Sequence, residues 1–441
     1  MQLKLKTIMG FWQNLINGNQ EKRHSDELVF GRFTDDFSNP SRAEIWDQAI
    51  LHYEKSDYVL SIVQLLEYLL NSQKTNLSYT QTENEINFSF IQGSKIITGY
   101  VKNEFFYAEV KLAHPIEMKI GFLREAIETT YHLQYGRFAL SDDQTICLLF
   151  DSYLEEASPY KIFYGLKEIA QYADRKDDTI TIDFSSLQPV NSADVIPIDN
   201  LEKEAKWLLV KNTIKKCLDP NSLGALNPDK FQGALTYILL AGLYKLDFLI
   251  KPEAKMMQYL EEAFQDYFRN KSTDLGEKIN SLKLKYNQID QIDKVSFDKE
   301  LYNVHSTFSW TNQINQAQLK EIIDAEFKSF DWYFENKHFQ ICEAICTYII
   351  GYLFYNYSFS MPMKQVAILY FELTEPDFFQ MINDNKSDSK INLHDLKKKL
   401  QQIFNSAKSI NPNFNYTYTL SEDSYYLMLK SLVIVLRDAN M

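Results

Sequence analysis

Hydrophobic positions recur at helical spacing in residues 43–70, which predicts two helices at the start of the folded region. Ile45, Trp46 and Ala49 fit a period of 3.6 residues. A second helix is expected from about Tyr58 to Leu70, because Ser56-Asp57 supplies a capping signal before it. Its expected apolar face consists of Val59, Ile62, Val63, Leu66 and Leu69.

From residue 86 the spacing of apolar positions changes from 3.6 to 2. Three alternating segments, 86–90, 96–101 and 105–112, are separated by turn signals at Gly93-Ser94 and Asn103. This pattern predicts three antiparallel strands in a meander. With a later hairpin over 138–140 and 145–150, the expected core face of the sheet contains Phe88, Phe90, Phe106, Ala108, Val110, Ile146, Leu148 and Phe150.

Two further helices complete the predicted first domain. One is expected over 116–134, after Pro115, and its predicted buried stripe is Ile120, Leu123, Ile127 and Tyr131. The other is expected from Tyr160 to about Arg175, because Pro159 favours the first helical position. The predicted order is α-α-β-β-β-α-β-β-α, an α+β domain that ends near Phe184.

The second half of the chain is dominated by helical spacing. Residues 185–200 contain Pro189 and Pro197 among small polar residues and are the expected linker. We therefore expect an N-terminal arm (1–42), an α+β domain (43–184), the linker (185–200) and a helical domain (201–441). The helices of the last domain are expected near 201–218, 229–249, 252–270, 318–336, 338–356, 362–373, 392–409 and 422–437.

Composition and charge narrow the class of protein. Gly and Pro total 13 + 11 = 24 of the 441 residues, which is less than half their usual share and favours long regular elements. The 30 Phe and 28 Tyr supply a large core. The 46 basic and 59 acidic side chains give a net charge of −13, which disfavours a nucleic-acid partner because phosphate contacts need clustered cations. The four cysteines are too sparse for a disulfide scaffold and suit a reducing compartment.

We expect no targeting signal and no membrane span, which favours a cytoplasmic protein. Gln13 and Asn14 interrupt the apolar stretch near the N-terminus, so we expect no signal peptide, and translation can start at Met1 or at Met9. The uncharged stretch 344–363 contains several polar residues, so a buried helix that runs into a loop explains it better than a membrane span. We expect a cytoplasmic protein without a membrane partner.

Three segments of the first half resemble the YbjN-like bacterial sensory-regulator family, which is similar in fold to type III secretion chaperones. They are GSKIITG (93–99), EAIE (125–128) with LQYGRFAL (133–140), and ASPYKIFYGLKEIA (157–170) followed by Ala173-Asp174 and Asp177-Asp178. The resemblance covers residues 43–184 and leaves the helical half unmatched. It implies a non-enzymatic, protein-binding domain of a fold that often dimerises and holds extended segments of a partner.

Candidate chemical sites are few. His338, Cys342 and Cys346 line one helical face with metal-ligand side chains, but a fourth ligand is missing and the apolar context suits cysteine as a small hydrophobe. The Lys397–Lys399 run suits a solvated helix face, and Asp384–Asp388 lacks the glycine of a calcium loop. We expect no catalytic residues, no metal and no cofactor.

One surface remains as a candidate for binding. The sheet face opposite the core should carry unusually many apolar side chains beside Glu109 and Lys111, whereas a solvated antiparallel face is normally polar. We expect the helical half to cover this face, with a second chain or a bound segment as the alternative cover. The candidate protein-binding residues on it are Ile96, Tyr100, Phe105, Tyr107 and Leu149.

These observations support two hypotheses of different classes. The first is a non-catalytic, adaptor-like or chaperone-like protein that binds a protein or peptide partner, or forms a homodimer, through the first domain. The second is a small-molecule sensor or enzyme with a pocket between the α+β and helical domains. A pocket with several convergent polar groups favours the second hypothesis, whereas a dry interface filled by Phe and Tyr contradicts it.

Overall fold

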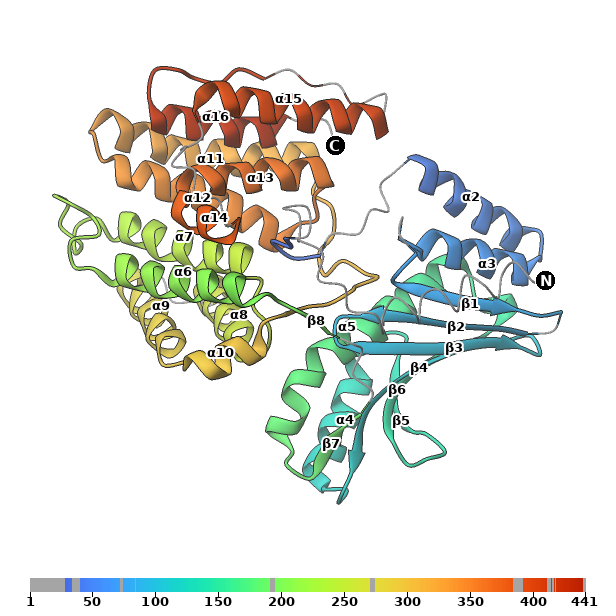
Figure 1. Ribbon diagram of the computed structural model, residues 1–441. Coiled ribbons are helices and arrows are strands. Elements are labelled where there is room, and N and C mark those ends of the chain that lie inside the picture. The colour runs from blue at the N-terminus through green and yellow to red at the C-terminus, as the bar shows by residue number, and fades with distance from the viewer. Residues whose placement is uncertain are drawn as a thin grey trace.

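The protein is an α+β molecule with an antiparallel sheet in its first half and a mostly helical second half, as predicted (Figure 1). The computed structural model describes residues 28–33, 40–71, 74–83, 85–190, 195–269, 274–383, 392–410, 414, 416 and 418–438, without the side chains of 40, 177–183 and 410. The two proposed starts, Met1 and Met9, and the Asp384–Asp388 loop lie outside the described residues.

The first half, which we call the α+β part, surrounds one sheet. The strand order is β1-β2-β3-β4-β6-β5 with antiparallel pairing throughout, and β7 pairs with the end of β4. Its elements are α2 (Pro40–Glu54), α3 (Tyr58–Leu69), β1 (Leu77–Gln81), β2 (Glu85–Gln92), β3 (Lys95–Lys102), β4 (Phe105–Pro115), α4 (Ile120–His132), β5 (Arg137–Leu140), β6 (Ile146–Tyr153), the 3-10 turn η2 (Leu154–Glu156), α5 (Pro159–Asp183) and β7 (Leu187–Pro189).

The predicted core face of the sheet is confirmed. All eight residues named for it are buried, and the ring of Phe106 lies 5.6 Å from that of Phe88 and 5.7 Å from that of Phe150. Helices α3 and α5 pack on this side. A Cβ at Gly165 of α5 would come within 2.7 Å of the Phe150 ring, so glycine there lets the helix approach the sheet closely.

The α+β part differs from the prediction in three further respects. Strand β1 was missed, because Leu77–Gln81 has one buried apolar residue and a polar outer face. Helix α5 continues to Asp183 rather than ending near Arg175. The segment expected to be a linker begins with β7, which extends the sheet, and contains β8 (Ile196–Pro197).

The predicted buried stripe of α4 is wrong. Ile120 and Ile127 are each 71% exposed and Tyr131 is 84% exposed, whereas the buried residues of the helix are Phe122 and Ala126. Two hydrogen bonds fix this orientation from the opposite side: Thr130 Oγ1 accepts from the Phe138 amide at 3.1 Å, and Thr129 bonds the Tyr172 hydroxyl at 2.9 Å. The helix therefore turns its more apolar stripe outward.

The second half, the helical part, has its own hydrophobic core around α7 and α12, which pack along each other. All eight predicted helices are present, and α9, α10 and α14 were missed. The bounds are α6 (Asn200–Leu218), α7 (Gln232–Ile250), α8 (Ala254–Arg269), α9 (Leu275–Asp290), α10 (Lys294–Glu300), β9 (Tyr302–Asn303), α11 (Gln316–Glu335), α12 (Phe339–Asn356), α13 (Met361–Thr374), α14 (Pro376–Ile382), α15 (Leu393–Ile410) and α16 (Tyr425–Asp438).

One helix of the described chain, α7, is long and apolar enough to cross a membrane by length and composition, and most of it is buried inside the protein. The stretch 344–363 behaves as predicted. It is the buried part of α12, followed by a short connection and the start of α13.

Residues 28–33 of the N-terminal arm pack on the helical part. Phe30 is 3% exposed and contacts the rings of Phe378 and Phe379 of the helical part. The Gly31 amide donates to the Phe248 carbonyl at 2.6 Å. Glycine is required there because its φ is +62° and a Cβ would lie 2.8 Å from the Phe248 ring.

Residues 301–315, which we call the strap, leave the helical part and insert into the core of the α+β part. Phe308 is fully buried there, with ring centroids 5.6 Å from Phe90 and 5.3 Å from Phe163. The Gln92 side-chain amide satisfies the strap backbone: its Oε1 accepts from the Phe308 amide at 2.9 Å and its Nε2 donates to the Phe308 carbonyl at 3.3 Å. The Gly93 amide donates to the His305 carbonyl.

We expect Phe308→Ala to lower the free energy of unfolding by about 3–5 kcal/mol, because it leaves a cavity between Phe90 and Phe163. The measurement is urea denaturation followed by circular dichroism. Phe268→Ala is the matched control, since Phe268 is 46% exposed, and it should cost less than about half as much. Equal losses for the two variants would contradict the anchoring role of Phe308.

Candidate functional sites

The five residues predicted to bind a partner lie on the outer face of the sheet, with different exposures. Ile96 is 36% exposed and Leu149 is 9% exposed, while Tyr100, Phe105 and Tyr107 are half-buried. Tyr100 and Tyr107 stack on each other with ring centroids 5.1 Å apart, and Phe105 meets Tyr153 edge to face. The structure therefore brings the five residues to one face, where much of their apolar area is covered by the other side chains of that face.

The expectation that the helical half covers this outer face is not met. The helices with extended contact to the strands are α3, α4 and α5, and the helical part reaches the sheet through the strap at the β2–β3 turn. Ion pairs border the face, such as Arg137–Asp151 at 2.6 Å and Lys111–Asp143 at 2.7 Å. The Tyr107 hydroxyl donates to Glu109 at 2.9 Å, and burial together with this bond raises the pKa of Tyr107.

A stronger candidate surface is a groove between α4 and β5, which we call the α4–β5 groove. It has a volume of about 720 Å³, open solvent included. Among the described residues, Thr130 is the one polar residue that lines it, and β5 is one of the two edge strands in the order β1-β2-β3-β4-β6-β5. Its apolar lining consists of Met118, Phe122, Leu123, Ala126, Ile127, Phe138, Ala139, Leu140 and Ile146.

The outward stripe of α4 extends the groove onto the protein surface. Ile120, Leu123, Ile127 and Tyr131 follow at helical spacing and are between 41% and 84% exposed. Ile116 and Leu140 add exposed apolar area at 67% and 51%. Single exposed apolar residues are normal on proteins, but a contiguous patch that leads into a groove is typical of an interaction site. The sequence shows this stripe plainly, although periodicity alone assigned it to the core.

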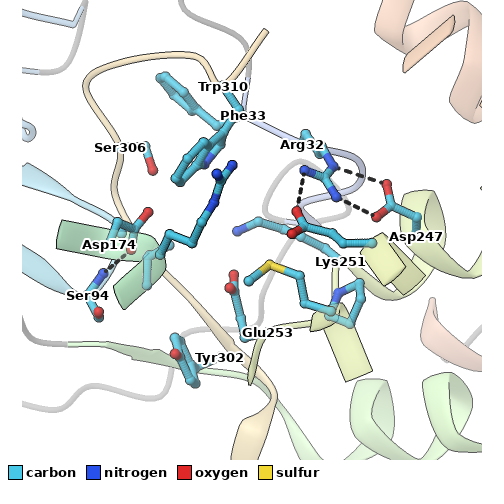
Figure 2. A pocket seen from close by; sticks show the side chains of 16 residues that line it. Arg32, Phe33, Ser94, Asp174, Asp247, Lys251, Glu253, Tyr302, Ser306 and Trp310 are labelled. Atoms are coloured by element: carbon cyan, nitrogen blue, oxygen red, sulfur yellow. Dashed lines mark hydrogen bonds and ion pairs between the residues drawn. The ribbon is translucent and has the colours of Figure 1, made fainter. Parts of the chain in front are cut away.

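A second cavity, the interface pocket, lies where the two parts meet (Figure 2). Its volume is about 750 Å³, open solvent included. It is lined by the arm, the β2–β3 turn, α5, the α7–α8 connection and the strap. At this pocket the interface between the two parts is not a dry layer of Phe and Tyr. Such a dry layer would have contradicted the second hypothesis. Its charged and polar lining residues are Arg32, Ser94, Asp174, Arg175, Asp247, Lys251, Glu253, Glu261, Tyr302 and Ser306.

One wall of the interface pocket is an ion-pair network that holds the arm in place. The Arg32 guanidinium pairs with Asp247 at 3.1 Å and with Glu261 at 3.3 Å (Figure 2). The guanidinium carbon also lies 4.1 Å from the centroid of the Tyr355 ring. Burial lowers the pKa of Arg32, but the neighbouring carboxylates outweigh it and hold that pKa above its usual range. Burial raises the pKa of Asp247, and Arg32 opposes this shift.

Beside this network lies Lys364, a buried lysine of α13. Lys364 is 7% exposed, and its side-chain nitrogen donates a hydrogen bond to the Arg32 carbonyl at 3.2 Å. Burial, together with the charge of Lys251, lowers the pKa of Lys364 from 10.5 to about 7. No described carboxylate forms an ion pair with it, so the protonated form is poorly stabilised in the folded protein.

The other sequence candidates do not assemble into a site in the described chain. Cys342 and Cys346 are fully buried in the core of the helical part, and the Cys342 thiol faces the Phe330 carbonyl. No group of three metal-ligating side chains is found among the described residues. In the Lys397–Lys399 run, Lys397 pairs with Glu422 and Lys399 with Glu372.

Comparison with known proteins does not identify the chain: no protein-family model matches it, and no curated protein matches it either. The resemblance of residues 43–184 to the YbjN-like family therefore stays a prediction.

We expect Lys364→Met to stabilise the protein at neutral pH by up to about 4 kcal/mol, because it removes a buried amine whose pKa is depressed. Between pH 7 and 10.5 the unfolded state binds more protons than the folded state at this lysine, so wild-type stability rises with pH there. The advantage of the variant should consequently be full below pH 7 and shrink toward pH 10.

Urea denaturation of both proteins at pH 6, 7, 8 and 9 measures this difference. A stability difference that stays constant over this range would contradict the depressed pKa of Lys364. Lys337→Met serves as a control, because Lys337 is exposed, and it should change stability little at any of these pH values.

Proposed function

We propose that this protein is a non-catalytic binding protein that holds an apolar segment of a partner protein in the α4–β5 groove. The single observation behind the proposal is the exposed stripe of α4, in which Ile120, Ile127 and Tyr131 are each more than two-thirds exposed. The adaptor-like or chaperone-like role predicted from the sequence is retained, but its surface moves from the outer sheet face to α4 and β5.

The groove suits a peptide segment for two reasons. Strand β5 pairs with β6 on one side, so in the described chain its other edge is open to an added strand. An added strand would place alternate side chains over the apolar floor formed by Phe122 and Leu140. An amphipathic helix packed along α4 would use the same stripe, because residues 120, 123, 127 and 131 share one helical face.

The exposed stripe contains enough apolar surface to support binding. Fully burying an isoleucine or leucine side chain contributes about 1.5–3 kcal/mol. Burial of the exposed parts of Ile120, Leu123 and Ile127 therefore contributes roughly 3–5 kcal/mol before the cost of ordering the partner. This amount supports a specific but moderate affinity, which suits a partner that is held and released.

The test compares binding by the wild type and by the double variant Ile120→Glu/Ile127→Glu. The purified full-length chain is used as bait in native lysate, and bound proteins are quantified by mass spectrometry. We expect the double variant to lose at least about 90% of a stoichiometric partner, because two buried charges oppose the apolar contact. Light scattering on the purified chain shows separately whether the partner is a second copy.

The matched control is Leu284→Glu/Val295→Glu, which changes two exposed apolar residues of α9 and α10 that are 63% and 79% exposed. The control should retain the partner, because it adds the same charge at another surface. A partner that binds wild type and both variants equally, or the recovery of no stoichiometric partner by wild type, would overturn the proposal.

A further inference from the structure

A half-buried carboxylate of the helical part, that of Glu326 in α11, has no cationic partner in the described chain. Its Oε2 accepts a hydrogen bond from the Tyr237 hydroxyl, and no described lysine, arginine or histidine forms an ion pair with it. Burial raises the pKa of Glu326, and the bond from Tyr237 opposes this shift only in part. A carboxylate removed from water in this way is normally balanced by a positive group.

Tyrosines from three other helices gather around this carboxylate. They are Tyr237 of α7, Tyr267 of α8, and Tyr348 and Tyr352 of α12, which we call the tyrosine cluster. The ring of Tyr348 lies 5.6 Å from that of Tyr237 and 5.8 Å from that of Tyr352. Burial raises the pKa of Tyr267, Tyr348 and Tyr352, and the charge of Glu326 raises it further, so these three side chains lie within the field of the carboxylate.

The tyrosine cluster reaches the protein surface. Tyr267 and Tyr352 are half-buried, and Phe268, whose ring lies 5.8 Å from that of Tyr352, is 46% exposed. One ring of the cluster already attracts a cation, because the Lys278 side-chain nitrogen lies 5.1 Å from the centroid of Tyr267. Lys278 forms no ion pair with Glu326, so within the described chain this negative charge stays without a partner beside several aromatic rings.

We propose that the tyrosine cluster binds an organic ammonium group, which pairs with Glu326 and lies against the tyrosine rings. The face of an aromatic ring attracts a cation, and proteins bind alkylammonium groups between such rings. An organic cation suits the site better than a metal ion, because no group of three metal-ligating side chains is present in the described chain. The site belongs to the helical part, so the proposal does not depend on partner binding at the α4–β5 groove.

The test is calorimetric titration of the full-length protein at constant ionic strength with two probes, tetramethylammonium and n-butylammonium. The former represents a quaternary ammonium ligand and the latter a lysine side chain, so the tighter probe identifies the source of the group. We expect at least one probe to bind with a Kd of about 1 mM or lower. Glu326→Gln should weaken that binding at least about tenfold, because it removes the ion pair and keeps the shape of the side chain.

Glu343→Gln is the matched control. Glu343 of α12 is also half-buried, and burial raises its pKa, but the charge of Lys245 opposes this shift. Its replacement should leave the affinity for both probes unchanged. Tyr267→Leu is a second variant, which leaves the carboxylate in place and should weaken binding about threefold, because one ring face is lost. Absence of binding by both probes would overturn the proposal, and so would equal affinity of wild type and Glu326→Gln.

Discussion

The insertion of Phe308 into the sheet core is the contact on which the rest of the structure depends. The ring packs against Phe90 and Phe163, and the Gln92 side chain satisfies the backbone on either side of it. A residue of the helical part thereby becomes part of the core of the α+β part. Because the strap is fixed at this point, its neighbouring residues Ser306 and Trp310 form a wall of the interface pocket.

The arm makes the reciprocal connection. It precedes the α+β part in sequence but packs on the helical part, through Phe30 and the Arg32–Asp247 ion pair. The two parts are thus joined by two segments, the arm and the strap, and residues of both segments line the interface pocket. In contrast, α4 and β5, whose residues line the α4–β5 groove, lie at the lower end of the α+β part in Figure 1, away from the helical part. The groove and the interface pocket are therefore separate places on the protein.

The spacing of apolar residues predicted most helices and strands correctly, because buried positions in these elements recur with the helical period of 3.6 or the strand period of 2. The strands over 86–112 and the eight helices of the second half are examples. The orientation of α4 could not be predicted in this way, since Thr130 bonds to Phe138 of β5 and Thr129 bonds to Tyr172 of α5, and the spacing of apolar residues within α4 does not show these contacts. The insertion of the strap could not be predicted either, because no pattern in the neighbouring sequence indicates that Phe308 enters the core of the α+β part. Both candidate sites depend on such long-range contacts.

Site-specific photo-crosslinking tests the central claim, binding of a partner protein at α4, most directly. A photoreactive phenylalanine analogue is placed at Tyr131 on the α4 stripe, or at Tyr153 on the outer sheet face, which are 84% and 62% exposed. The protein is then irradiated in the cells that express it. A covalent adduct of one defined mass from position 131, and none from position 153, is the predicted result. No adduct from position 131, or an adduct from position 153 alone, would contradict the account.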